Sequence, residues 1–204
     1  MMSTTLFAAP EALNGHKMDA KTYLERERAG IREFEGKYEL FNQTLIFMAG
    51  ASEAHNNIAG NILTILNNYI WLHEVNYHAF QSDMRVVSFL DYKDYFYPDV
   101  VFIAGKTRYD DAQKDVLNNP TVLLEVLSDS TEEFDRTDKF ESYKQIESLK
   151  EYILVSQYER RVEHFYKNET GEWITSKVYK NGELPLKSIA YSLPLKRIYH
   201  GMAF

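Results

Sequence analysis

The sequence predicts a protein of the α/β class, and three observations lead to this prediction. Residues 53–73 repeat apolar side chains at the spacing of an amphipathic helix. Residues 122–127 form a short apolar run of the kind found in strands buried on both faces, and a second helical pattern comes directly after it. Other strand-like segments, separated by turn residues, occupy much of the remaining chain. With 204 residues, 45% of them hydrophobic, the chain can form one substantial core.

The first residues differ in character from the rest of the chain. Residues 1–17 lack periodicity, so we expect a flexible N-terminal arm followed by a single domain over residues 18–204. This domain should begin with a short charged helix over residues 18–29. Alternation over residues 37–49 then predicts two short strands joined by a turn. Glu39 lies on the first of these strands, where an isolated acid usually faces solvent.

The clearest helix is the one predicted over residues 53–73. Ser52 is a suitable N-cap residue, and the inward stripe includes Ile58 and Ile62. His55 lies on the same stripe. A single histidine on a helix face is more often a packing residue than a ligand, so the helix pattern alone leaves its role open.

Strand-like segments continue on both sides of the 122–127 run. Before it we expect strands at 77–80, 84–90 and 96–103, then a polar surface linker over 104–119. The aromatic turn at 91–95 could stack on bases, although a hairpin tip or a dimer contact is the commoner role. After the second helix, strands are expected at residues 151–155, 161–167, 172–179 and 188–191.

Two acids adjoin the buried strands. Asp99 precedes an apolar run, and Glu125 interrupts the 122–127 strand, where an unpaired carboxylate would be costly. If the two strands pair, these acids converge. A helix from about residue 131 to 148 would place Arg136 and Lys139 in the middle of its apolar face. Either the cations extend past the sheet edge, one forms a structural ion pair with Glu125, or Lys139 points into an active site.

Composition excludes several kinds of site. The absence of cysteine rules out disulfides, thiolate zinc sites and cysteine nucleophiles, and it fits a cytoplasmic location. No glycine-rich phosphate loop, nucleophile elbow or H-E-x-x-H pair occurs. Residues 1–10 have no basic n-region, so we expect no signal peptide, and no apolar run is long enough to cross a bilayer, so no membrane partner is expected. A net charge of −7 without a dense basic tract argues against tight nonspecific DNA binding.

Two carboxylates with a lysine directed at them suit a hard cation. Mg²⁺, or alternatively Mn²⁺, is typically held by one or two carboxylates, with waters and substrate phosphate completing its shell. Asp99 and Glu125 are the predicted ligands, and the Val126 carbonyl is a third candidate. Such an ion polarises a phosphodiester and lowers the pKa of bound water. Lys139 would orient that water or stabilise the developing charge.

The same residues carry a resemblance to a known family. The P-D…(D/E)-x-K signature of the restriction-endonuclease-like superfamily resembles Pro98-Asp99 followed by Glu125-Val126-Leu127. A wider pattern over about residues 19 to 166 is similar to the bacterial Uma-two branch of restriction endonucleases. The motifs that carry it are Tyr38-Glu39-Leu40, His55, Pro98-Asp99-Val100, Glu125-Val126-Leu127-Ser128, Ser130-Thr131, Asp135-Arg136, Lys139, Tyr143 and Glu151-Tyr152.

This resemblance implies a restriction-endonuclease-like core, with a central mixed sheet flanked by helices, and often a homodimer. It also implies magnesium ligation by Asp99 and Glu125 and a supporting acid at Glu39. Two departures stand out. Leu127 occupies the usual lysine position, so that role must move to Lys139, and Asn42-Gln43 stands where the family favours Asp-Gly.

We therefore predict a metal-dependent endonuclease that hydrolyses DNA phosphodiester bonds with an activated water. Its catalytic residues would be Asp99, Glu125, Lys139 and Glu39, with His55 and Arg136 as substrate-binding or supporting residues. Two alternatives stay open. One is a catalytically inactive nuclease-fold module that binds DNA or another partner, and the other is a hydrolase of a small phosphorylated substrate.

Overall fold

The fold was analysed in a computed structural model that describes residues 13–29, 36–175 and 177–204. Most of the arm predicted over residues 1–17 therefore lies outside the described residues. Residues 13–17 run beside the first hairpin, where Gly15 N donates to Leu45 O at 2.8 Å. In chain order the elements are α1 Ala20–Ala29, β1 Lys37–Phe41, β2 Thr44–Met48, α2 Glu53–His73, β3 His78–Gln81, β4 Arg85–Phe89, β5 Lys93–Phe96, β6 Val100–Ile103, β7 Val116–Leu117, β8 Val122–Leu127, α3 Glu132–Arg136, α4 Asp138–Tyr143, β9 Glu151–Ser156, β10 Val162–Lys167, β11 Trp173–Thr175, β12 Glu183–Leu186, β13 Tyr191–Pro194 and α5 Leu195–Ile198.

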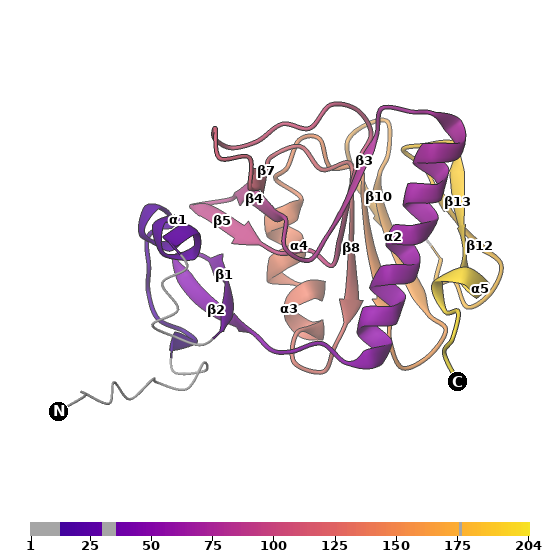
Figure 1. Cartoon of the computed structure of the whole chain (residues 1–204), viewed down its shortest axis with the longest axis horizontal. Coiled ribbons are helices and arrows are strands. Elements are labelled where there is room, and N and C mark those ends of the chain that lie inside the picture. Colours follow the sequence, from indigo (N-terminus) through magenta and orange to yellow (C-terminus); the bar gives the residue numbers. More distant parts are fainter. Residues whose placement is uncertain (1–12, 30–35, 176) are drawn as a thin grey trace.

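The strands form two main sheets. A five-stranded sheet has the order β2-β1-β5-β4-β7, and a six-stranded sheet has the order β11-β10-β9-β8-β6-β3, while β12 and β13 pair separately. In the larger sheet β8 runs parallel to β9 and antiparallel to β6. This mixed sheet with flanking helices confirms the predicted α/β fold class (Figure 1).

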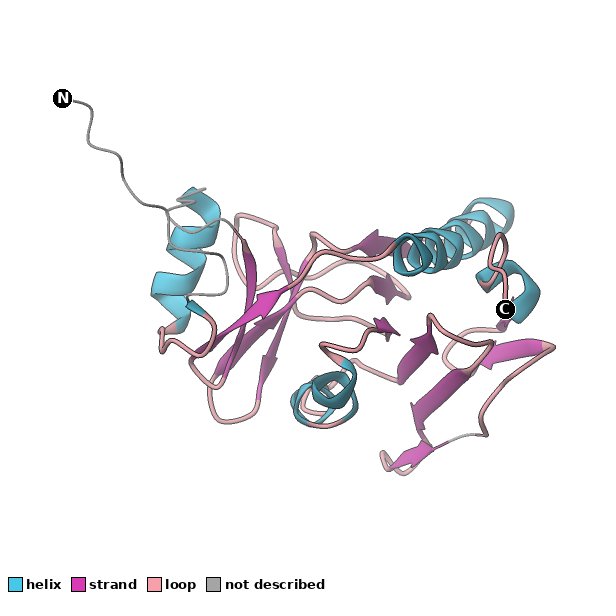
Figure 2. Ribbon diagram, turned by 90° about the horizontal axis from the view of Figure 1, so that it is seen from below, coloured by secondary structure: helices cyan, strands magenta, loops and turns pink. Residues whose placement is uncertain are grey.

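Helices cover both faces of the six-stranded sheet. Alternate residues of a strand face opposite sides, so Val122, Leu124 and Val126 of β8 pack with α2 and α5. Leu123 and Leu127 pack on the other face with α4. Figure 2 shows the long α2 on one side of this sheet. The short helices α3 and α4 lie on the other side, between the two sheets. The larger sheet thus separates two apolar clusters, and β8, the strand that carries Glu125, contributes residues to both.

The prediction for α2 is confirmed in detail. The Ser52 hydroxyl accepts a hydrogen bond from His55 N at 3.0 Å and satisfies one of the free amides of the first turn. Ile58 and Ile62 are fully buried and pack against the larger sheet. Even α2, the longest described helix, lacks the apolar character needed to cross a membrane, and so do the other described helices.

The β1–β2 turn forms despite its unusual sequence. Asn42 and Gln43 both adopt positive φ angles, 47° and 56°, as the two central residues of a type I′ turn do. Asn42 N donates to Asp94 Oδ1 at 2.8 Å, which fixes the turn to β5. The register of the hairpin is regular and pairs Glu39 with Ile46. The Asn42-Gln43 turn therefore keeps Glu39 in the regular register of the hairpin, although Asp-Gly was the expected pair at this position.

Several predicted elements differ from the structure, among them the strand expected over 188–191, where residues 187–190 form a turn before β13. The helix expected from 131 to 148 is two short helices that meet at Thr137, and the chain turns after Lys144. The strand expected over 96–103 is divided between β5 and β6, which belong to different sheets, because the chain crosses between sheets at Pro98. The strand expected over 172–179 is regular only in β11.

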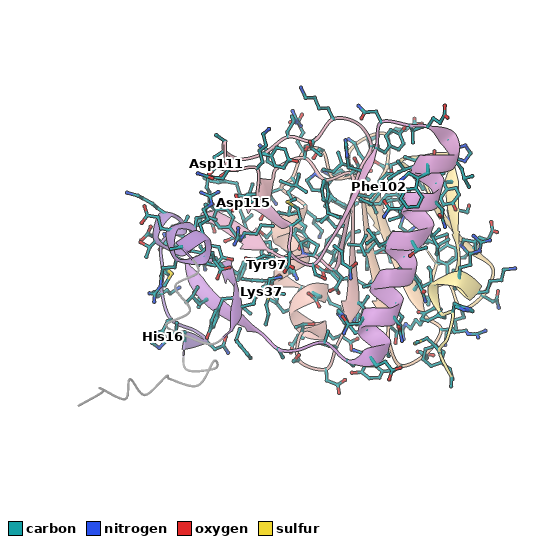
Figure 3. The ribbon with its side chains drawn as sticks, viewed as in Figure 1. His16, Lys37, Tyr97, Phe102, Asp111 and Asp115 are labelled. Atoms are coloured by element: carbon teal, nitrogen blue, oxygen red, sulfur yellow. The ribbon has the colours of Figure 1, made fainter. Side chains whose placement is uncertain are left out.

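The segment 104–119, predicted to be a surface linker, contains the buried strand β7, which pairs in parallel with β4. Acidic residues of this segment fasten it to α1. Arg28 Nη2 lies 2.8 Å from Asp111 Oδ2 and 2.6 Å from Asp115 Oδ1, and both acids lie beside α1 (Figure 3). Its polar composition thus reflects these contacts as well as exposure.

Candidate active site

The two predicted acids meet because of strand register. β6 and β8 are antiparallel with Val100 opposite Leu124, so continuing the register by one residue places Asp99 opposite Glu125. Residues that lie opposite each other project from the same face. Asp99 N donates to Glu125 Oε2 at 3.1 Å, and Val126 N donates to Asp99 Oδ2 at 2.7 Å. This end of β8 lies near α3 and the start of α2 (Figure 1).

Lys139 reaches the same place from α4. Its Nζ lies 3.0 Å from Glu39 Oε1, 3.0 Å from Glu125 Oε1 and 3.3 Å from Asp135 Oδ1. These four residues, which we call the acidic cluster, are only 3–4% exposed. Lys139 therefore does not extend past the sheet edge. It forms an ion pair with Glu125 at the position where an active site was predicted.

The cluster holds more negative than positive charge, since one ammonium contacts three carboxylates. Burial lowers the pKa of Lys139, but the surrounding carboxylates outweigh this and raise it well above its usual value. Burial raises the pKa of Glu125 well above its usual value. The Lys139 charge acts to lower this pKa, whereas the neighbouring acids raise it further. Lys139 therefore stays charged, and the excess negative charge favours either a proton on Glu125 or a bound cation.

Two further groups hold the acids of the cluster. Tyr143 donates its hydroxyl to Glu125 Oε1 at 3.0 Å, and burial raises the pKa of this phenol well above its usual value, so it remains a donor. Tyr97 N donates to Glu39 Oε1 at 2.8 Å. The Tyr97 ring in turn lies under the ammonium of Lys37, 3.7 Å from its centroid (Figure 3). Glu39 is thus a buried, hydrogen-bonded acid, and the expectation that it faces solvent is wrong.

His55 contacts the other metal-ligand candidate. Its Nε2 lies 3.0 Å from Asp99 Oδ2, while its Nδ1 is buried without a hydrogen-bond partner. Burial lowers the pKa of His55, but the hydrogen bond and charge of Asp99 raise it above its usual value. His55 is therefore placed to orient Asp99 and is more than a packing residue of α2.

The structure does not bring Arg136 to the cluster. Its guanidinium binds Glu163 of β10 through two hydrogen bonds of 2.8 and 2.7 Å and contacts Glu132 at 2.8 Å. This fork-to-fork geometry is the strong form of an arginine–carboxylate pair. Arg136 therefore joins α3 to the edge of the larger sheet, and its supporting role is structural in this arrangement.

Asp135 is the member of the cluster that sequence reasoning did not select. It lies four residues before Lys139, the spacing at which acidic and basic side chains meet on a helix. The break at Thr137 preserves this contact. The spacing was visible in the sequence, but acids on helices are mostly exposed in proteins, so the pattern gave no sign that Asp135 is buried.

The donor set fits a magnesium-type ion. Among the described residues, no three His, Cys, Asp or Glu side chains are arranged to hold a metal ion by themselves. Asp99 and Glu125 still supply two adjacent carboxylates, which is the number magnesium commonly uses beside waters. The Val126 N–H points toward Asp99, and its carbonyl lies on the same edge of β8. Pro98, opposite in the continued register, has no N–H to donate to that carbonyl.

Comparisons with known proteins identified a matching family model and related sequences. The family model described as Uma2, putative restriction endonuclease, matches residues 20–194. The uncharacterized protein sll1609 of Synechocystis sp. is 34% identical over 168 residues, which cover 82% of this chain and 91% of that protein. A second Synechocystis protein, slr1290, also uncharacterized, is 30% identical over 188 residues and 92% of this chain, or 94% of its own length.

A solved structure shares the fold. The crystal structure of a putative nuclease of the DUF820 group from Anabaena variabilis superposes with a TM-score of 0.69 at 16% identity, covering 89% of this chain and 97% of that one. At this identity the likeness establishes the fold alone. The match of the family model to most of the chain goes further, and with it the chain belongs to the Uma2 family of putative restriction endonucleases.

Proposed function

We propose that this protein is a metal-dependent endonuclease that hydrolyses DNA phosphodiester bonds with an activated water. The observation that carries the proposal is the pairing of Asp99 with Glu125 beside the Lys139 ammonium, which lies 3.0 Å from Glu125. Family membership supports a nuclease, and the excess of carboxylates supports a divalent cation. Mg²⁺ is the ion we favour, with Mn²⁺ as an alternative.

Each residue of the site has a distinct task in this proposal. Asp99, Glu125 and the Val126 carbonyl would hold the ion, which when bound polarises the phosphodiester and lowers the pKa of a water. Lys139 would donate hydrogen bonds to the attacking water or to the phosphate oxygens as their charge grows. Glu39 and Tyr143 hold Lys139 and Glu125 in position, and His55 orients Asp99.

A second candidate function also has an observation in its favour. The acidic cluster is almost closed to solvent, and its members already have partners, as in a static ion-pair network. This arrangement suits a nuclease-fold module that binds DNA or another partner without cleaving it. The net charge of −7 would in turn favour a small phosphorylated substrate over DNA. Homodimer formation and a cytoplasmic location remain predictions.

Metal binding and cleavage are tested separately. Thermal unfolding of the wild type should shift upward with Mg²⁺ or Mn²⁺, because an ion at about 100 times its dissociation constant adds about 2.7 kcal/mol of stability. Asp99→Asn should lose this shift. Asp83→Asn, which changes a side chain that is 96% exposed, is the matched control and should keep it. An equal shift in all three proteins would place the ion elsewhere and overturn the site.

The cleavage assay then separates the candidate functions. Supercoiled plasmid and bis(p-nitrophenyl) phosphate are incubated with wild type, Asp99→Asn, Asp83→Asn and Lys139→Arg in the presence of Mg²⁺ or Mn²⁺. Nicking by wild type and Asp83→Asn alone supports a DNA nuclease. Turnover of only the small ester supports the small-substrate alternative. Metal binding without any turnover supports the inactive module.

A further inference from the structure

A polar pocket lies at the opposite end of the larger sheet from the acidic cluster. It has a volume of about 540 Å³ and is lined by residues that include Ala104, Thr121 and Glu151, at the end of β6 and the starts of β8 and β9. Thr121 and Val126 are five positions apart in the chain, which corresponds to about 16 Å along an extended strand. The pocket is therefore separate from the candidate active site.

Four cations line this pocket: Arg108, Lys150, Lys167 and Lys187. None of them lies within ion-pair distance of a carboxylate of the described residues; Lys167 is half-buried, and the other three are exposed at the pocket. The chain as a whole carries a net charge of −7, so carboxylates are abundant elsewhere. A group of cations without carboxylate partners in a concave site is the usual setting for a bound anion.

Two of these lysines face each other directly. Glu151 lies opposite Tyr166 in the antiparallel pair of β9 and β10, so Lys150 lies opposite Lys167, and Lys167 N donates to Lys150 O at 2.8 Å. Like charges in this position destabilise a sheet. Burial lowers the pKa of Lys167, and the Lys150 charge lowers it further. An anion between the two ammonium groups would relieve this repulsion.

The wall of the pocket is held in a fixed shape. Glu151 is fully buried and accepts hydrogen bonds from Lys187 N at 2.9 Å, Ser188 N at 2.7 Å and the Ser188 hydroxyl at 2.5 Å. His164 Nε2 lies 2.6 Å from the same carboxylate. These four donors together occupy the two oxygens of Glu151, so the acid positions the Lys187–Ser188 segment and does not pair with the lysines. Lys167 Nζ donates to Ile146 O at 3.4 Å and Lys187 Nζ lies over the Tyr166 ring, so neither ammonium has an anionic partner among the described residues.

The opposite wall is fixed in the same way. The Asn119 side chain accepts a hydrogen bond from Arg108 N at 2.7 Å and donates one to Lys106 O at 3.0 Å. Thr121 Oγ1 accepts a hydrogen bond from Ala104 N at 2.9 Å. The loop that carries Arg108 is thereby tied to the start of β8, which makes the pocket a preformed site.

We propose that this pocket binds a phosphate group, at a site distinct from the candidate active site. Four cations suit a multiply charged anion better than they suit a single carboxylate. The volume of the pocket falls within the range of about 300–1,000 Å³ typical of small-molecule sites. The phosphate could belong to a free small molecule or to a DNA backbone.

The proposal is tested by calorimetric titration of the whole chain with inorganic pyrophosphate, in EDTA so that the acidic cluster holds no divalent ion. We expect binding that weakens at least tenfold in Lys150→Gln/Lys167→Gln. Lys21→Gln is the matched control, because it removes the same charge from an 84% exposed side chain of α1, and it should bind as the wild type does. Lys187→Gln, at an exposed position, provides a second test if the double variant does not fold.

A competition experiment identifies the source of the phosphate. Displacement of pyrophosphate by a short DNA duplex would assign the pocket to a nucleic-acid backbone, whereas continued binding in its presence would assign it to a free phosphorylated molecule. Absence of pyrophosphate binding at millimolar concentrations would overturn the proposal. So would equal affinity in the wild type and in the folded pocket variants.

Discussion

Replacing Lys139 should show how strongly the buried carboxylates of the acidic cluster depend on its one positive charge. Lys139→Met removes the cation that contacts Glu39, Glu125 and Asp135 and leaves three carboxylates buried together. Removing one partner of a buried ion pair costs about 3–5 kcal/mol. For a chain of this length each kcal/mol lowers the melting temperature by about 2–4 °C, so the expected decrease is about 6–20 °C. The measurement is thermal and urea unfolding in EDTA.

The matched control is Lys144→Met at the end of the same helix. Lys144 lies 2.5 Å from Glu141, but this pair is partly exposed, and such pairs contribute at most about 1 kcal/mol. A second comparison uses Glu125→Gln, which should lie within about 1 kcal/mol of the wild type because Lys139 keeps two carboxylates. Combining Glu125→Gln with Lys139→Met should recover part of the loss, since it removes one unpaired charge.

Two results would refute this reasoning. If Lys139→Met is as stable as Lys144→Met, the cluster is not short of positive charge. If the double variant is less stable than Lys139→Met alone, Glu125 contributes packing or hydrogen bonds and not repulsion. Either result would also remove the electrostatic argument for a cation between Asp99 and Glu125.

Two further predictions concern other parts of the fold. Glu151 has a lowered pKa, because its hydrogen bonds to His164 and Ser188 outweigh the effect of burial. Its stabilising effect is therefore present above the unfolded-state pKa of about 4.3 and is lost as the pH falls through the folded-state value. Glu151→Gln should cost about 1.5–3 kcal/mol in urea unfolding at pH 7, and the difference from wild type should shrink below pH 4; a difference that is constant with pH would contradict this. Gln43→Gly should raise stability by up to about 1 kcal/mol, because glycine adopts the φ of 56° without strain, and a lower melting temperature would count against a type I′ turn.

The convergence of Asp99 and Glu125 could be predicted because it depends on local patterns. Each acid adjoins or interrupts an apolar run, and antiparallel pairing of those runs brings the two together. The placement of Lys139 was predictable for a similar reason. Its position relative to Phe140 and Tyr143 is set within two helical turns, so the break at Thr137 did not alter the face on which it lies.

The second sheet could not be predicted, because it depends on contacts between distant parts of the chain. Residues 96–103 read as one strand, yet Phe96 and Val100 belong to different sheets. The burial of Glu39 has the same cause. Tyr38, Glu39 and Leu40 are all buried, since α1 covers one face of β1 and the acidic cluster lies on the other. Alternation along a hairpin indicates one buried face and gives no sign of a second.

The position of the lysine is explained by the geometry of the cluster. Leu127, where the related signature carries its lysine, lies on the same face of β8 as Glu125 and is buried among apolar residues. An ammonium at Leu127 would need carboxylates in that apolar region. From α4, Lys139 instead reaches acids of β1, β8 and α3 at once. The charge that completes the site therefore also joins the two sheets, so a change that displaces α4 should affect the stability of the fold and the candidate active site together.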